Sequence, residues 1–291
     1  MAPKTRCYLA DRGPAKPPRL TERRPGPNNA LAMDKGGSVR RTRLPAPLAP
    51  VIVLAGMAAM LLVVRPAFVL GLRPALLLSE TALVVPGLLA LAAFGVPLSA
   101  GLALRPIDSR SALLVAAVAA ALWVASLGLF EVQYSFWSPP EGYLEAFERL
   151  HEALRPRNPA DALLSVAAIA AAPAFCEELL MRGIVLPSLL PAFGRVAAVA
   201  VTAALFALIH LDAYRSAFTF ALGLALGALR LRTGSLLAPV LAHALVNTIT
   251  FAAAPFTDDP AAARASPASR PHPPHRGRGV RDAVHASRAL R

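Results

Sequence analysis

Long apolar runs dominate the chain from Leu48 onward, and most are close to the length that crosses a bilayer. A helix needs about 17–25 apolar residues to span a hydrocarbon core of about 30 Å. Seven stretches meet or approach this length: 48–64, 75–96, 111–130, 162–190, 195–211, 216–231 and 235–254. The pattern predicts an all-α, polytopic transmembrane helix bundle.

The number of crossings predicted from this pattern is six to eight. Helix-breaking residues cluster in one apolar segment, at Gly183, Pro187, Pro191 and Gly194. A broken helix around 180–195 would therefore add a crossing. The excess of basic residues at the amino end, together with the arginines of the 97–110 loop, predicts a cytoplasmic N-terminus. With seven crossings the Arg-rich carboxyl end would lie outside, against the same rule.

Residues 131–160 interrupt the apolar pattern with acidic and basic side chains. Within them, Tyr143, Phe147, Leu150 and Leu154 recur at the spacing of one helical face. This stretch predicts an amphipathic helix that lies in the membrane interface or caps the bundle.

The composition agrees with a membrane protein, because 56% of the residues are hydrophobic and only 16% are charged. Most of the net charge of +13 lies at the two ends. We therefore predict a basic, Pro-rich, disordered tail at 1–46, a transmembrane domain at 47–256 and an Arg/Pro-rich disordered tail at 257–291. Beside a membrane, such tails favour contact with anionic lipid, and no nucleic-acid partner is expected.

One apolar segment contains two adjacent carboxylates and an arginine, at Glu177, Glu178 and Arg182. Charged groups inside a membrane helix are costly and usually carry function. Glu178 and Arg182 stand at i and i+4 and can pair, whereas adjacent residues point about 100° apart. Glu177 is therefore predicted to face a cavity, a substrate or a metal ion.

The late apolar segments contain two further polar pairs with i, i+4 spacing. Phe206 and His210 share one helical face, as do His243 and Asn247. A glutamate with two histidines and an amide suits peptide-bond hydrolysis, in which a carboxylate accepts a proton from water and donors stabilise the oxyanion. The same Glu177, His210 and His243 suit a zinc site with an open water position. The residues alone leave both schemes open.

These three motifs, in this order on successive apolar segments, resemble those of the CPBP family of intramembrane proteases. The family includes the type II CAAX prenyl endopeptidases (Rce1-like) and proteins linked to bacteriocin immunity. The resemblance covers about residues 160–255, which would form the protease core. It implies that Glu177 activates water with the help of His210, and that His243 and Asn247 stabilise the oxyanion. Glu178, Arg182 and Phe206 would have supporting roles. Both a zinc-dependent and a metal-independent glutamate mechanism fit the family.

Two other classes of function remain open at this stage. A proton-coupled transporter also uses glutamates and histidines in the membrane, although it predicts ionisable groups in both halves of the chain. A catalytically silent scaffold or immunity protein would keep the residues without turnover. For the enzyme, the expected substrate is a peptide or a membrane-protein tail, and the Ala/Arg/Pro bias suggests a bacterial cytoplasmic membrane. The Gly223–Gly227 pair favours close helix packing within the chain and leaves a homo-oligomer open.

Overall fold

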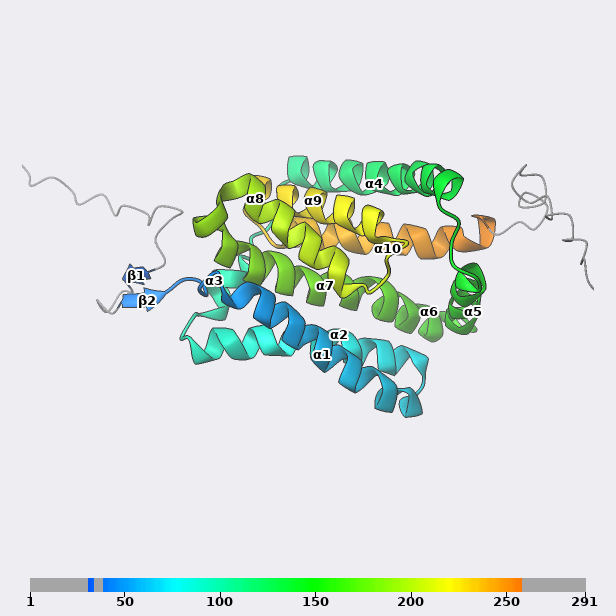
Figure 1. Cartoon of the computed structure of the whole chain (residues 1–291), viewed down its shortest axis with the longest axis horizontal. Helices are drawn as coiled ribbons and strands as arrows, with labels where there is room; N and C mark the ends of the chain where they lie inside the picture. Colours follow the sequence, from blue (N-terminus) through cyan, green and yellow to red (C-terminus); the bar gives the residue numbers. More distant parts are fainter. Residues whose placement is uncertain (1–30, 34–38, 258–291) are drawn as a thin grey trace, which may run out of the picture.

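The computed structural model describes residues 31–33 and 39–257, and in this part of the chain the protein is a helical bundle (Figure 1). Its long and short helices are α1 (Leu48–Ala67), α2 (Leu72–Ala93), α3 (Leu98–Leu102), α4 (Ser109–Phe136), α5 (Tyr143–Leu154), α6 (Pro159–Val166), α7 (Ala172–Glu178), α8 (Leu186–Ile209), α9 (Ser216–Thr233) and α10 (Leu237–Thr257). A 3₁₀ turn, η1 (Phe68–Leu70), follows α1, and two π-helical stretches, η2 (Ala167–Ala171) and η3 (Leu179–Val185), flank α7. The predicted all-α membrane bundle is confirmed.

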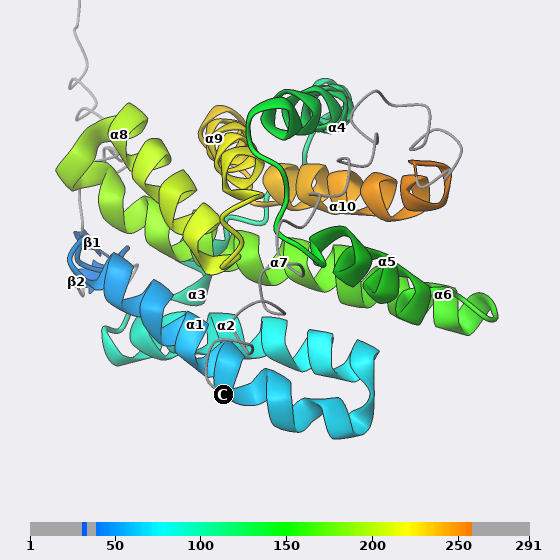
Figure 2. The same cartoon turned by 45° about the vertical axis from the view of Figure 1, so that its right-hand side comes forward.

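The helix α7 lies at the centre of the arrangement, between α2 and α10, and packs against both (Figure 2). On one side of it, α1 and α2 pack against each other. On the other side, α10 also contacts α4 and α9, while α8 packs against α9 and η3. The glutamate-bearing segment is therefore surrounded by helices from both ends of the chain.

Four helical runs among the described residues are long and apolar enough to cross a membrane: Leu48–Leu70, Leu72–Ala93, Ser109–Phe136 and Pro159–Ile209. Leu237–Ala253 is a shorter apolar helix. The last of the four runs has 51 residues, far more than one crossing needs. By length and composition, these helices are those of an integral membrane protein.

The 51-residue run is not one straight helix, because it contains a sharp break at Gly194. This glycine has φ 71° and ψ 178°, a conformation that side chains with a Cβ rarely adopt. Pro191 lies just before it and cannot donate its backbone nitrogen to the helix. The segments predicted at 162–190 and 195–211 are thus two arms that meet at this break, where the sequence predicted a broken helix.

A close approach between α8 and α9 depends on two glycines. A Cβ at Gly223 would lie 2.9 Å from the Cα of Ala203, and one at Gly227 would lie 2.9 Å from a methyl of Val199. Both distances are shorter than Cβ contacts in proteins normally are. The glycine pair therefore serves packing within the chain, which is the favoured sequence interpretation.

The amphipathic helix predicted between the third and fourth apolar segments is α5. Its last residue, Leu154, is buried, whereas Leu150 is exposed. The predicted tails lie mostly outside the described residues. Within the amino-terminal one, β1 (Leu31–Met33) pairs with β2 (Val39–Arg41) in an antiparallel hairpin that the apolar pattern does not predict.

Candidate active site

The local backbone around the two glutamates is unusual, because α7 has only 7 residues and is flanked by π-helical turns. A π-helical turn adds one residue to the helical repeat and therefore rotates the side chains that follow it. Such turns occur frequently at functional sites. Here they set the direction in which Glu177, Glu178 and Arg182 project from one long, apolar segment.

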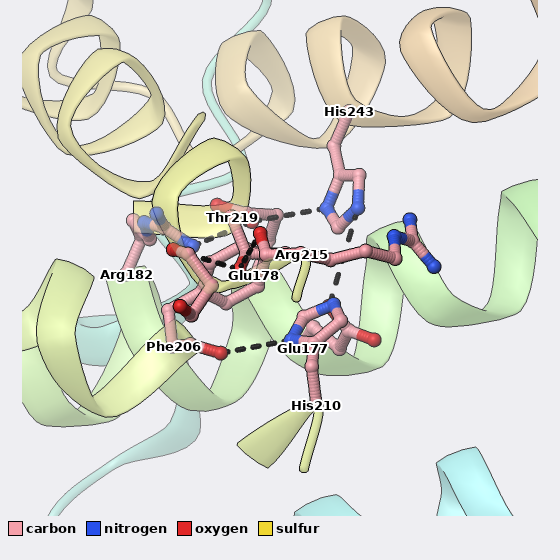
Figure 3. A network of polar contacts seen from close by, with 9 residues as sticks. Glu177, Glu178, Arg182, Phe206, His210, Arg215, Thr219 and His243 are labelled. Atoms are coloured by element: carbon pink, nitrogen blue, oxygen red, sulfur yellow. Dashed lines mark hydrogen bonds and ion pairs between the residues drawn. The ribbon is translucent and has the colours of Figure 1, made fainter. Parts of the chain in front are cut away.

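Glu178 and Arg182 form a fully buried ion pair, as the i, i+4 spacing predicts. The Arg182 Nη1 donates to Glu178 Oε1 over 2.7 Å, and neither side chain has any exposed surface. The Nη2 of Arg182 donates to the carbonyl oxygen of Gly223 on α9 over 2.8 Å. Its guanidinium also lies over the Phe206 ring, 4.7 Å from the centroid. Arg182 thereby ties α7 to α8 and α9 (Figure 3).

Glu177 points away from this pair and towards two imidazoles (Figure 3). Its Oε2 lies 3.9 Å from His210 Nε2 and 4.0 Å from His243 Nε2. These distances are too long for direct hydrogen bonds. Glu177 Oε2 is buried and forms no hydrogen bond with any described residue. The structure therefore brings together the three ionisable groups predicted to converge, and leaves one carboxylate oxygen without a partner between two ring nitrogens.

The other nitrogen of each imidazole is already engaged. His210 Nδ1 lies 2.8 Å from the Phe206 carbonyl oxygen, and His243 Nδ1 lies 3.2 Å from Glu178 Oε1. Carbonyl and carboxylate oxygens only accept, so Nδ1 must carry the proton in both contacts. In the neutral rings, Nε2 therefore presents its lone pair towards Glu177. These contacts fix the ring orientation as well as the tautomer.

Phe206 packs against His210, His243 and Arg182. Its ring meets the His210 ring edge-on at 4.9 Å between centroids and the His243 ring at 5.7 Å, and the Arg182 guanidinium covers it. The side chain is fully buried. Phe206 therefore holds both imidazoles in place by packing, while its carbonyl orients His210.

Asn247 lies one helical turn beyond His243 on α10 and is partly buried. Its side-chain amide forms no hydrogen bond within the part of the chain that the structure describes. The structure thus places Asn247 on the helix that carries His243, without a hydrogen bond to Glu177. Its participation in the site stays a prediction.

Glu80 on α2 is a further carboxylate close to the site, and the motifs do not include it. Its Oε2 is buried and has no hydrogen-bond partner among the described residues, and the group interacts electrostatically with Glu177. The packing of α2 against α7 brings the two acids together. The available sequence signal was the same as for Glu177, namely a carboxylate within an apolar segment.

The spacing of Glu177, His210 and His243 differs from that of a zinc site. In a tetrahedral zinc site with bonds of 2.0–2.1 Å, two ligand atoms lie about 3.3 Å apart. Here Glu177 Oε2 is 3.9 and 4.0 Å from the two Nε2 atoms. No group of three His, Cys, Asp or Glu residues in the described chain is arranged to hold a metal ion. In this conformation the residues do not fit zinc, and they would have to move closer together to bind it.

Comparison with known families places this site in a recognised domain. Residues 159–249 match the family described as type II CAAX prenyl endopeptidase Rce1-like. This range includes Glu177, His210 and His243, as well as the π-helical turns beside α7. Searches among curated proteins and among solved structures found no match. The match over residues 159–249 supports an Rce1-like domain of the CPBP intramembrane protease family in this part of the chain.

Proposed function

We propose that the protein is an endopeptidase that hydrolyses a peptide bond with water activated by Glu177. One observation supports this mechanism most directly. The buried Glu177 Oε2 faces two imidazole nitrogens at 3.9 and 4.0 Å and has no partner among the described residues. One water molecule could bridge these atoms, because it could lie about 2.8 Å from Glu177 Oε2 and about 2.8 Å from an imidazole nitrogen.

In this mechanism, Glu177 is the general base. The water donates one hydrogen to Glu177 Oε2 and the other to the lone pair of His210 Nε2, so that its oxygen is directed at the substrate carbonyl. Phe206 keeps His210 in the required tautomer through its carbonyl oxygen. As the water attacks, its proton passes to Glu177, which then supplies a proton to the departing amine.

His243 is the proposed oxyanion donor, together with Asn247. In its neutral form, with the proton on Nδ1, His243 cannot donate from Nε2. As an imidazolium, His243 has a hydrogen on both nitrogens and can donate from Nε2. The Glu178 carboxylate lies beside its Nδ1 and the Glu177 carboxylate beside its Nε2, and both would stabilise the positive ring. The ion pair of Glu178 with Arg182 holds this acceptor in place. The expected contribution of a single oxyanion donor is about 10²–10³ in kcat.

The proposed substrate is a peptide or the tail of a membrane protein, which reaches the site from within or beside the bilayer. We also propose a bacterial cytoplasmic membrane with the N-terminus on the cytoplasmic side, on the basis of the composition and the basic amino end. Anionic lipid is the expected contact of the basic ends. A homo-oligomer remains part of the proposal.

The decisive experiment compares Glu177→Gln with Glu152→Gln in purified protein reconstituted in lipid vesicles. Glu152 lies on α5 in an exposed pair with Arg155. Glu152→Gln therefore makes the same change of charge as Glu177→Gln, at a position away from the site. We expect Glu177→Gln to lower the cleavage rate of a library of tail peptides by at least about 100-fold, the usual scale for a general base. Glu152→Gln should cleave as the wild type does.

A Glu177→Gln variant with full activity would refute the mechanism. Cleavage lost in chelator and restored by zinc would replace it with the metal scheme, in which Glu177, His210 and His243 bind the ion. Proton flux or uptake without cleavage would favour a transporter. Absence of both activities in well-folded wild-type protein would favour a silent scaffold or immunity protein.

A further inference from the structure

The connection between His210 and α9, residues 211–215, is unusually constrained for a short loop. It will be called the His210 loop. Leu211 has φ 51°, a left-handed conformation that a branched, non-glycine residue rarely adopts. Such a conformation persists only where the surrounding structure fixes it. The side chains that hold the loop are therefore also those that maintain the backbone directly after His210.

Asp212 is the polar anchor of the His210 loop. Its Oδ1 accepts a hydrogen bond from the Arg215 backbone N–H over 3.0 Å, which closes the loop on itself. Its Oδ2 accepts from the hydroxyl of Tyr143 on α5 over 2.7 Å. The second bond joins positions 69 residues apart in sequence. A hydrogen bond to a charged acceptor is stronger than one between neutral groups.

Aromatic packing holds the same loop from α4 and α5. Tyr214 is buried, its ring meets the rings of Tyr143 at 5.1 Å and Trp137 at 5.4 Å, and its carbonyl oxygen accepts from Gln133 Nε2 over 2.6 Å. In addition, the Arg215 guanidinium lies 5.4 Å from the centroid of the Phe147 ring. The 131–160 insert thus contacts the loop beside the site.

The helix α5 also reaches the other elements of the site. The His151 ring stacks on Phe251 of α10, the helix that carries His243. At the end of α5, the Arg73 side chain of α2 donates to the Leu154 carbonyl oxygen over 3.3 Å. α5 therefore bridges the His210 loop, α10 and α2.

We propose that Tyr143 is a positioning residue for His210, because its hydroxyl fixes Asp212 and thereby the backbone of the His210 loop. The inference deepens the proposed hydrolase function and rests on it. Tyr143 contacts neither Glu177 nor the imidazoles and acts only through the loop. Burial and the hydrogen bond to Asp212 raise the pKa of Tyr143, so its hydroxyl stays protonated and remains a donor at neutral pH.

The variant Tyr143→Phe tests this role, because it removes the hydroxyl and keeps the ring that packs on Tyr214 and Phe147. Tyr134→Phe is the matched control, since the Tyr134 hydroxyl forms no hydrogen bond with a described residue. We expect Tyr143→Phe to lower kcat by about 10-fold and to leave KM within about twofold, as loss of one hydrogen bond to a charged group implies. Tyr134→Phe should change neither.

A second measurement does not depend on activity. Amide hydrogen exchange in detergent should become about 10-fold faster for the His210 loop in Tyr143→Phe, and stay unchanged in the transmembrane part of α8 and in Tyr134→Phe. Asp212→Asn keeps an acceptor oxygen and should lose less activity than Asp212→Ala. The double variant Tyr143→Phe/Asp212→Ala should be no worse than Asp212→Ala alone.

Unchanged exchange in the His210 loop of Tyr143→Phe would overturn the proposal, as would additive losses in the double variant. A uniform rise in exchange over the whole bundle would also overturn it, because that result denotes general destabilisation. If wild-type protein cleaves no peptide while the loop-specific change in exchange is present, the hydrolase function fails and the link from Tyr143 to the loop is still supported.

Discussion

Replacing Arg182 is predicted to cost more stability than any other single change of charge in the described bundle. Arg182 is the largest fully buried side chain, and its guanidinium contacts Glu178, the Gly223 carbonyl oxygen and the Phe206 ring. The variant Arg182→Met keeps most of the volume and removes all three polar or cation–π contacts. It also leaves the carboxylate of Glu178 buried without its counter-charge.

The expected loss of stability follows from the buried Glu178 carboxylate, which loses its ion-pair partner. Removing one partner of a buried ion pair costs about 3–5 kcal/mol, mainly through the remaining unpaired ion. The lost bond to Gly223 and the lost contact with Phe206 belong to the same network and do not simply add to this value. For a domain of this size, 1 kcal/mol shifts Tm by about 2–4 °C, which gives an expected fall of about 6–20 °C.

Thermal unfolding in detergent, followed by circular dichroism, measures this fall. The matched control is Arg195→Met, because Arg195 is exposed and its replacement should change stability by about 0.5 kcal/mol or less. Replacing both charges, as in Glu178→Leu/Arg182→Met, should recover about 2 kcal/mol relative to Arg182→Met, since neither partner of the pair is then left buried without the other. A loss below about 1 kcal/mol in Arg182→Met, or no recovery in the double variant, would refute the argument.

Two further predictions concern helix contacts. Gly223→Ala places a Cβ 2.9 Å from Ala203 Cα and should destabilise the protein by about 1–3 kcal/mol, whereas Gly128→Ala, with open space around it, should be neutral or stabilising in the same unfolding assay. Asp108 caps α4 by accepting from the Ser111 backbone N–H. The Ser111 side chain, followed by this backbone hydrogen bond, lowers the Asp108 pKa. The Asp108 cap therefore stabilises α4 fully above the pKa that Asp108 has in the unfolded state. This stabilisation is lost as pH falls through the lower pKa of the folded state, and amide exchange in α4 becomes faster. Asp108→Asn should abolish this acid-dependent change in exchange.

The sequence predicted the i, i+4 pair of Glu178 and Arg182 because both residues lie on one helical segment and the geometry between them is local. It also located α5, since the aromatic and aliphatic spacing of that helix is a local property as well. The break at Gly194 followed from the Pro and Gly content of its segment. Each of these three features depends on residues that are only a few positions apart in the sequence.

Other features required contacts between distant segments. The involvement of Glu80 depends on the packing of α2 against α7. The bond from Tyr143 to Asp212 joins a helix and a loop whose separation no periodic pattern encodes. The π-helical turns beside α7 were not predicted either, because the apolar spacing of a segment buried on several sides does not report the local helical repeat.

The amino-acid sequence by itself determined that this is a helical membrane protein with charged groups in its apolar segments, because a bilayer demands runs of a given length and penalises every exception. Only the tertiary structure decided that Glu177 Oε2 lies between the Nε2 atoms of His210 and His243, and that the Nδ1 atoms donate elsewhere. The physical reason is that each of these orientations is set by hydrogen bonds and packing between helices. Such interactions depend on how the helices are arranged in space and not on the spacing of residues along any one of them.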